Sequence, residues 1–260
     1  MVANNVPNPN GLSALIVSEF NGALVRSGVS ANNKLVSAGV RVVPDSFNGS
    51  TDCRGSILWD MVREAFPFSN LDQIMDDTSA DMALTIFRTG SLYTPCPDPE
   101  HDSIPAILAA ASGQFGGVAT LPYPGLFDFT TADNAFANTS DTYALGDLTA
   151  IHEIGHVLGG LHANTVKLPD AAFPLSEYAH GMEGNNAGSW QTIMGGYTTN
   201  RCNFDWQVDP NQQPCDRIPY FSNPSKQVLV NSQWVTIGTL VDTPTNDADL
   251  TQLDPDAQFK

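Results

Sequence analysis

The feature that most constrains this chain is the spacing of three histidines near its middle. Three of the five histidines lie within the eleven residues from 152 to 162. His152 and His156 are four residues apart, so on a helix they share one face, with Cβ atoms about 5–6 Å apart. Two imidazoles at that separation can each reach one zinc ion at about 2.0–2.1 Å. The spacing therefore predicts a helix with a metal-binding face.

The residues around these histidines extend the prediction to a third ligand. Ile151, Ile154 and Leu158 lie on the opposite side of the helix. We expect that side to pack on the core and the histidines to face a cleft. The Gly159-Gly160 pair can end the helix and turn the chain, because glycine tolerates positive φ. His162 can then approach the same metal from another direction.

The residue types also indicate a catalytic site. Three neutral imidazoles leave one position of a tetrahedral zinc ion open for water, which is typical of catalytic rather than structural zinc. Glu153 is not needed as a ligand and is placed to accept a proton from the metal-bound water, as a general base. His101 and His180 lack ligand spacing, so we interpret both as non-ligands.

Two motifs resemble one protein family. The stretch from 152 to 162, HEIGHVLGGLH, is similar to the extended zinc signature of the metzincin metalloproteases. Residues 192–197, TIMGGY, resemble the Met-turn of that family, which implies that Met194 forms an apolar floor beneath the zinc ligands. Residues 202–224, which end in RIPYFSNP, most resemble secreted bacterial proteases of the reprolysin-like kind.

The resemblance implies a fold and a domain organisation. We expect an α/β (α+β) protein with the zincin or metzincin fold, in which a mixed twisted sheet and the active-site helix lie above an irregular C-terminal lobe. Alternating strands and helices in the first half independently indicate an α/β layer. The predicted subdomains are residues 1–162, with the sheet and zinc helix, and residues 163–260, with the Met-turn; together they form one catalytic domain.

Two further site assignments follow from the same resemblance. Several metzincins carry a tyrosine two residues after the methionine, as a fifth zinc ligand or a transition-state contact. Here Tyr197 lies three residues after Met194, so that role stays open. The strand around 116–121 corresponds to the edge strand that pairs with substrate, which implies peptide binding at Gly117, Val118 and Ala119. The alternative is a plain core strand.

The remaining patterns predict elements along the chain. Strands are expected at 13–20, 39–44, 81–87 and 115–122, helices at 21–37, 55–65 and 103–112, a loop at 134–141, a helix start near Asp147, and a hairpin over 227–238 around Asn231 and Ser232.

Composition excludes some classes of partner. The chain has 28 acidic and 11 basic residues, a formal net charge of −17. This balance argues against nucleic-acid and anionic-membrane binding, since both need basic patches. No apolar run approaches the roughly 20 residues of a membrane helix, and no signal peptide is visible. We expect a monomer that acts on a protein or peptide substrate.

The cysteines predict disulfide bonds and a cellular location, and the acidic segments predict possible calcium sites. Cys202 and Cys215 form the natural local pair, and Cys53 with Cys96 would be the second disulfide. Two disulfides would indicate an oxidising, extracellular location, so we expect a secreted protein. The alternative is four buried thiols in a cytosolic protein. The Asp-rich segments 127–147 and 242–256 predict either calcium sites or a solvated acidic face.

These observations predict a zinc-dependent endopeptidase, with zinc as cofactor and Glu153 as the base that activates water for peptide-bond hydrolysis. A zinc hydrolase acting on a small amide or ester is the alternative, and a closed pocket would favour it. A binding module with a relic metal site is a third reading. Glu153 speaks against that reading, because a relic site has no need of a base beside its ligands.

Overall fold

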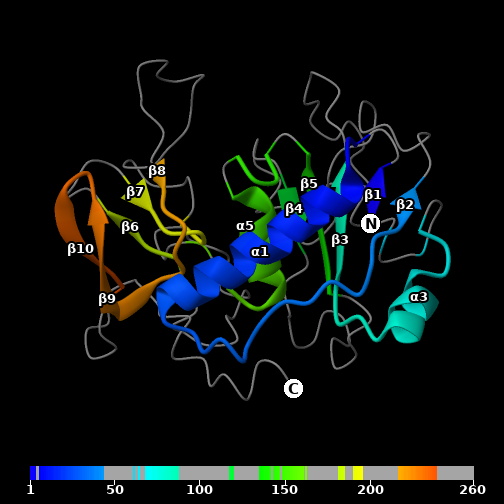
Figure 1. Ribbon diagram of the computed structural model, residues 1–260, viewed down its shortest axis with the longest axis horizontal. Helices are drawn as coiled ribbons and strands as arrows, with labels where there is room; N and C mark the ends of the chain where they lie inside the picture. Colours follow the sequence, from blue (N-terminus) through cyan, green and yellow to red (C-terminus); the bar gives the residue numbers. More distant parts are fainter. Residues whose placement is uncertain are drawn as a thin grey trace, which may run out of the picture. The chain divides into compact units, whose positions relative to one another are not determined.

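A computed structural model describes residues 1–3, 6–43, 61, 64, 68–87, 117–119, 135–141, 143–146, 148–160, 162, 181–184, 190–195 and 216–238. Over these residues the protein combines helices and strands in an α+β arrangement (Figure 1), which confirms the coarse fold class. The chain divides into two compact units, one of Met1–Glu19 with Leu35–Leu158 and one of Phe20–Lys34 with Gly159–Lys260. Residues 20–34 therefore group with the C-terminal part of the chain.

The first unit contains a five-stranded sheet in the order β2-β1-β3-β5-β4. Its strands are β1 (Val2–Ala3), β2 (Val42–Val43), β3 (Ala83–Phe87), β4 (Gly117–Ala119) and β5 (Phe136–Ser140). Strand β3 runs parallel to both β1 and β5, whereas β4 runs antiparallel to β5, so the sheet is mixed as expected. The predicted strands at 39–44, 81–87 and 115–122 correspond to β2, β3 and β4.

The loop predicted at 134–141 is wrong, because this segment contains β5, which lies between β3 and β4. All five residues of β5 are buried, and Asn138, Thr139 and Ser140 are fully so. A strand with neighbours on both sides pairs its backbone groups through two ladders, which stabilise it despite side chains of low strand propensity. Small polar side chains without apolar alternation gave no strand signal in the sequence.

The strand predicted at 13–20 is wrong, because one helix, α1 (Pro9–Ser27), covers the whole range. The helix predicted at 21–37 is confirmed for 21–27 only, since residues 28–37 are not helical. Asn8 caps the start of α1 by accepting a hydrogen bond from the Gly11 N–H at 3.2 Å, and proline suits the first helical position. The buried side chains recur at helical spacing and are Ile16, Phe20, Ala23, Leu24 and Ser27. Gly28, at φ 94°, follows its last residue.

A second helix of the first unit, α3 (Leu71–Thr78), was not expected from the sequence. It buries Leu71 and Met75 on one side. Of the helix predicted at 55–65 only two positions are described, Met61, which is helical, and Glu64, which lies in a turn. The helix predicted at 103–112 lies outside the described residues. No helix in the described part of the chain is both long and apolar enough to cross a membrane.

The second unit contains two small sheets. Strands β6 (Glu183–Gly184), β7 (Trp190–Gln191) and β8 (Asp216–Arg217) form the first, and β9 (Asn223–Val230) pairs with β10 (Gln233–Ile237) in the second. Asn231 and Ser232 join β9 to β10 with φ of 47° and 67°, as a two-residue hairpin turn requires. The predicted hairpin is therefore confirmed. Its buried face packs with Trp190 in a core of Trp190, Val228, Val230, Val235 and Ile237.

The C-terminal end of α1 is tied to the segment that leads into β9. The hydroxyl of Ser27 accepts a hydrogen bond from the Phe221 N–H at 2.8 Å, and the side-chain amide of Asn223 donates to the Ser27 carbonyl at 2.6 Å. Arg26 donates through Nε to the Pro219 carbonyl at 3.1 Å. These polar contacts connect residues nearly 200 positions apart and anchor the helix end within the second unit.

Candidate metal centre

The three predicted ligands come from α5 (Thr149–Val157) and the residues just after it. The helix begins at Thr149, preceded by Leu148 at φ 62°, and so starts two residues after the predicted position; Asp147 itself lies outside the described residues. Within the first unit α5 contacts β4 and β5, and it buries Ile151 and Ile154 almost completely. Its apolar residues therefore pack as the sequence pattern predicted.

A glycine ends α5, as expected. The Leu158 N–H still donates to the Ile154 carbonyl at 3.1 Å, but Gly159 has a φ of 91°, which side chains with a Cβ rarely adopt. The chain turns at this residue, and His162 follows three positions later. The turn gives His162 an approach to the other two histidines that a continued helix would not allow.

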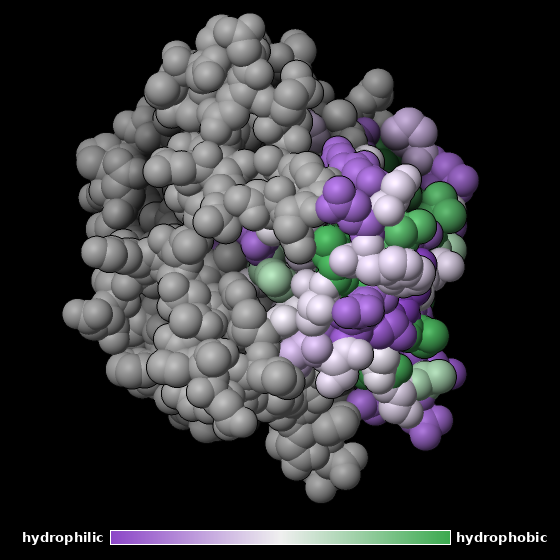
Figure 2. All heavy atoms as spheres, turned by 90° about the vertical axis from the view of Figure 1, so that its left-hand side faces the viewer, coloured by the Kyte–Doolittle hydropathy of each residue, from purple (hydrophilic) through white to green (hydrophobic). Residues whose placement is uncertain are grey.

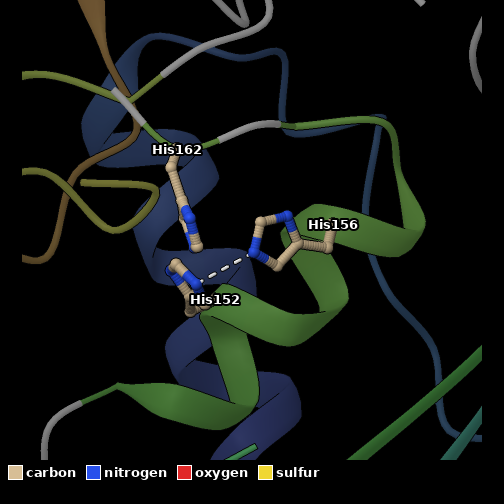
Figure 3. A group of neighbouring side chains, drawn as sticks. All are labelled: His152, His156 and His162. Carbon is tan, nitrogen blue, oxygen red and sulfur yellow. Dashed lines mark hydrogen bonds between the residues drawn. The ribbon is translucent and has the colours of Figure 1, made fainter. Parts of the chain in front are cut away.

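The imidazoles of His152 and His156 converge on each other. Their Nε2 atoms are 3.0 Å apart, their ring centroids are 4.5 Å apart, and the rings are nearly perpendicular at 86°. Both residues project from successive turns of α5 (Figure 3). The one-turn spacing read from the sequence thus brings two ligand nitrogens to one point.

His162 completes the group. One ring nitrogen from each of the three histidines lies within 4.8 Å of the others, and Figure 3 shows the His162 ring directed toward the α5 pair. Two nitrogens bound to one tetrahedral zinc at 2.0–2.1 Å would be about 3.3 Å apart. The separation of 3.0 Å between His152 and His156 is close to that value. The three side chains therefore fit a single metal ion, although their arrangement does not identify which metal.

The site is more enclosed than the helical pattern suggested. His152 is 6% exposed and His156 is 5% exposed, and Glu153 between them on the chain is 3% exposed. Every residue from Thr149 to His156 is buried, so the histidine side of α5 does not form an open surface. A carboxylate and two imidazoles buried together form a polar group in low-dielectric surroundings, where a bound cation would be strongly favoured.

The predicted Met-turn is a turn in the second unit. The Gly195 N–H donates to the Thr192 carbonyl at 2.9 Å, which places Ile193 and Met194 at the turn's centre, and Met194 is fully buried. Gly181 lies so close to the peptide after Met194 that any added Cβ would overlap it. This contact was not predictable from the sequence, because two residues thirteen positions apart without periodicity leave no local signal.

The hydroxyl and the backbone of Thr192 also hold this turn through hydrogen bonds. The Thr192 N–H donates to the Met182 carbonyl at 2.9 Å, and the Met182 N–H donates to the Thr192 hydroxyl at 2.8 Å. The backbone of the next residue, Ile193, donates to the Tyr220 carbonyl at 2.9 Å. The turn around Met194 is therefore held by segments that come before and after it in the chain.

The other predicted site residues are only partly described. Gly117, Val118 and Ala119 form β4, the end strand of the sheet as described, and pair on one side with β5. The remaining assignments lie outside the described residues: Tyr197, the pairs Cys53–Cys96 and Cys202–Cys215, His101, His180, the segment 242–256 and, within the segment 127–147, residues 127–134, 142 and 147.

Comparisons with known proteins add little. No protein-family model and no curated protein sequence matches the chain. Among solved structures, a chain from "Structure of a chaperone-substrate complex" is similar at 14% identity and a TM-score of 0.48. The match covers 91% of this chain but 30% of that chain, so this protein spans less than a third of its neighbour's length. A likeness of that degree carries no argument about function.

Proposed function

We propose that this protein is a zinc-dependent endopeptidase. The observation that carries the proposal is the convergence of His152, His156 and His162, each offering a ring nitrogen within 4.8 Å of the others. The resemblance of HEIGHVLGGLH to the metzincin zinc signature supports zinc as the metal and peptide hydrolysis as the reaction. The same resemblance supports the metzincin fold. The α+β arrangement of the described residues agrees with that fold at the level of fold class.

The proposed mechanism uses the chain's own residues as follows. The three histidines would hold the metal through neutral imidazole nitrogens. A zinc ion in such a site polarises a carbonyl group and lowers the pKa of water. Glu153 accepts the proton of the attacking water at its carboxylate and then gives it to the leaving amine. Glu153 directly follows His152 in α5 and is 3% exposed.

The position of β4 supports a peptide as the substrate. Strand β4 is the end strand of the described sheet and contacts the zinc helix α5. An extended peptide can pair with such a strand through main-chain hydrogen bonds, independently of side-chain sequence. A small amide or ester would gain nothing from a strand of this kind, so β4 favours the peptidase. The burial of His152, Glu153 and His156 is the observation on the side of the alternative hydrolase, which a closed pocket would suit.

Metal content and cleavage, measured together, test the proposal. Protein purified without chelator should contain about one zinc per chain and should cut a diverse peptide pool, as read by mass spectrometry. Dipicolinate should remove both the zinc and the activity, and added zinc should restore both. Protein that neither contains nor takes up zinc contradicts the metal site. Zinc-loaded protein that hydrolyses small esters but no peptide contradicts the peptidase and favours the alternative.

A further inference from the structure

The outward face of the β9–β10 hairpin carries the most exposed aromatic side chain in the described part of the chain. Trp234 is 69% exposed, and Leu229, its direct cross-strand partner, is 59% exposed. Side chains of such partners lie about 4.5–5.5 Å apart at Cβ, so the two form one apolar spot. Figure 2 looks onto the side of the molecule where the hairpin lies.

The hairpin holds this spot in a defined orientation. Val228, Val230, Val235 and Ile237 point to the opposite face and are buried with Trp190. Alternation along each strand therefore forces Leu229 and Trp234 outward. Single exposed apolar side chains are ordinary on protein surfaces, but here two of them lie side by side on a hairpin whose other face is part of a core.

On the outward face of the hairpin itself, the described residues beside the spot are polar and uncharged. The next cross-strand pair on the outward face is Gln227 with Thr236, and the turn supplies Asn231 and Ser232. Lys226 is the one charged residue in the range 223–238, and its position in the alternation places it with Val228 and Val230 on the other face. In a chain with a formal net charge of −17, this neutral surface is distinctive.

We propose that the outward face of the β9–β10 hairpin binds a neutral carbohydrate chain, with Trp234 as its stacking platform. The apolar face of a sugar ring packs on an exposed indole, while amide and hydroxyl side chains exchange hydrogen bonds with sugar hydroxyls. Gln227, Thr236 and Asn231 supply those groups. This role is separate from the metal centre and does not rest on the proposed peptidase activity.

Two other occupants fit the surface less well. A protein partner needs about 800 Å² of contact on each side, whereas an aromatic side chain contributes about 150–250 Å² and the described spot adds only one leucine. An anionic membrane requires a basic surround, which the outward face of the hairpin does not provide, because the one basic residue of the range 223–238, Lys226, belongs to the other face. A sugar chain needs only a small contact area that is uncharged and partly apolar, as the described spot is.

Binding to cellulose, chitin, xylan and soluble β-1,3-glucan tests the proposal. The intact protein should bind at least one of them, with little change between low and high salt, because no charge is involved. Trp234→Ala should weaken that binding by about tenfold or more, and Trp234→Phe should recover part of it. Val36→Ala removes an equally exposed apolar side chain, at 68%, from another segment and should leave binding unchanged.

Two sets of results would overturn the proposal. One is a failure of all four carbohydrates to bind, or binding that Trp234→Ala leaves intact. The other is a dimer in light scattering that Trp234→Ala converts to monomer without any carbohydrate effect, which would assign the spot to a second copy of the chain. The circular dichroism spectrum of each variant should match that of the parent, as expected for a substitution at an exposed position.

Discussion

The Nε2 atoms of His152 and His156 lie 3.0 Å apart, and both side chains are almost completely buried. Two imidazoles this close can share a hydrogen bond without any metal. The ring nitrogen of His162 belongs to the same compact group, within 4.8 Å of the other two. A cation at the centre accounts for all three side chains, and the variants below separate the two explanations.

The first prediction separates the base from the ligands. Glu153→Gln keeps the size of the side chain and removes its basicity, so bound zinc should remain while the rate of peptide cleavage falls about 10²–10⁴-fold. His156→Ala removes a ligand and should lose zinc and activity together. Zinc content and cleavage rate are measured on both variants in the same buffer. Near-normal turnover in zinc-loaded Glu153→Gln would show that another group accepts the proton.

The second prediction concerns the support of the Met-turn. A Cβ at Gly181 would overlap the carbonyl of Met194 and the following peptide, so Gly181→Ala must displace backbone rather than a flexible side chain. We expect the free energy of unfolding to fall by about 1–3 kcal/mol, as for other overpacked sites. Urea unfolding followed by tryptophan fluorescence measures this change.

Gly22→Ala is the matched control for that substitution. It lies within α1, where an added Cβ meets Nη1 of Arg26 at 3.0 Å. The guanidinium, which donates through Nε to the Pro219 carbonyl, must then shift by a few tenths of an ångström, but no backbone is displaced. Alanine is the better helix former by about 1 kcal/mol, so this variant should be as stable as the parent or more so. Equal losses in both variants would mean that the Gly181 contact has no special role.

The third prediction addresses the anchor of α1. Ser27 is fully buried, and its hydroxyl donates to the Ala23 carbonyl at 2.6 Å while accepting from the Phe221 N–H. Ser27→Ala leaves that N–H buried without its partner, so the free energy of unfolding should fall by about 1–3 kcal/mol. Thr78→Ala removes an exposed hydroxyl that also bonds within its own helix and should change stability by less than about 0.5 kcal/mol. A loss below that level in Ser27→Ala would contradict the anchoring role.

The fourth prediction concerns the compartment. We expect Cys202–Cys215 and Cys53–Cys96 to be disulfides, as in a secreted protein. Peptide mapping without reducing agent should recover each pair as one linked fragment. Four free thiols in protein handled under alkylating conditions would overturn both pairings and the extracellular location that depends on them.

The metal-binding group and the hairpin were predictable from the sequence because short-range geometry determines them. His152 and His156 share a helix face by their spacing alone, and Gly159 marks the turn that precedes His162. The β9–β10 hairpin follows from alternating apolar residues on either side of Asn231 and Ser232, two residues that tolerate the positive φ of a tight turn. In each case the residues that decide the structure are within about ten positions of each other.

Only the tertiary structure decided the rest, because the deciding contacts are far apart in the chain. Strand β5 is a strand because β3 and β4 pair with its two sides, although its own residues lack a strand pattern. Residues 13–20 contain branched apolar side chains that suggest a strand, yet they belong to α1, whose end Ser27 and Arg26 tie to residues 219–223. The burial of His152 and Glu153 likewise depends on packing around α5, which a helical periodicity cannot reveal.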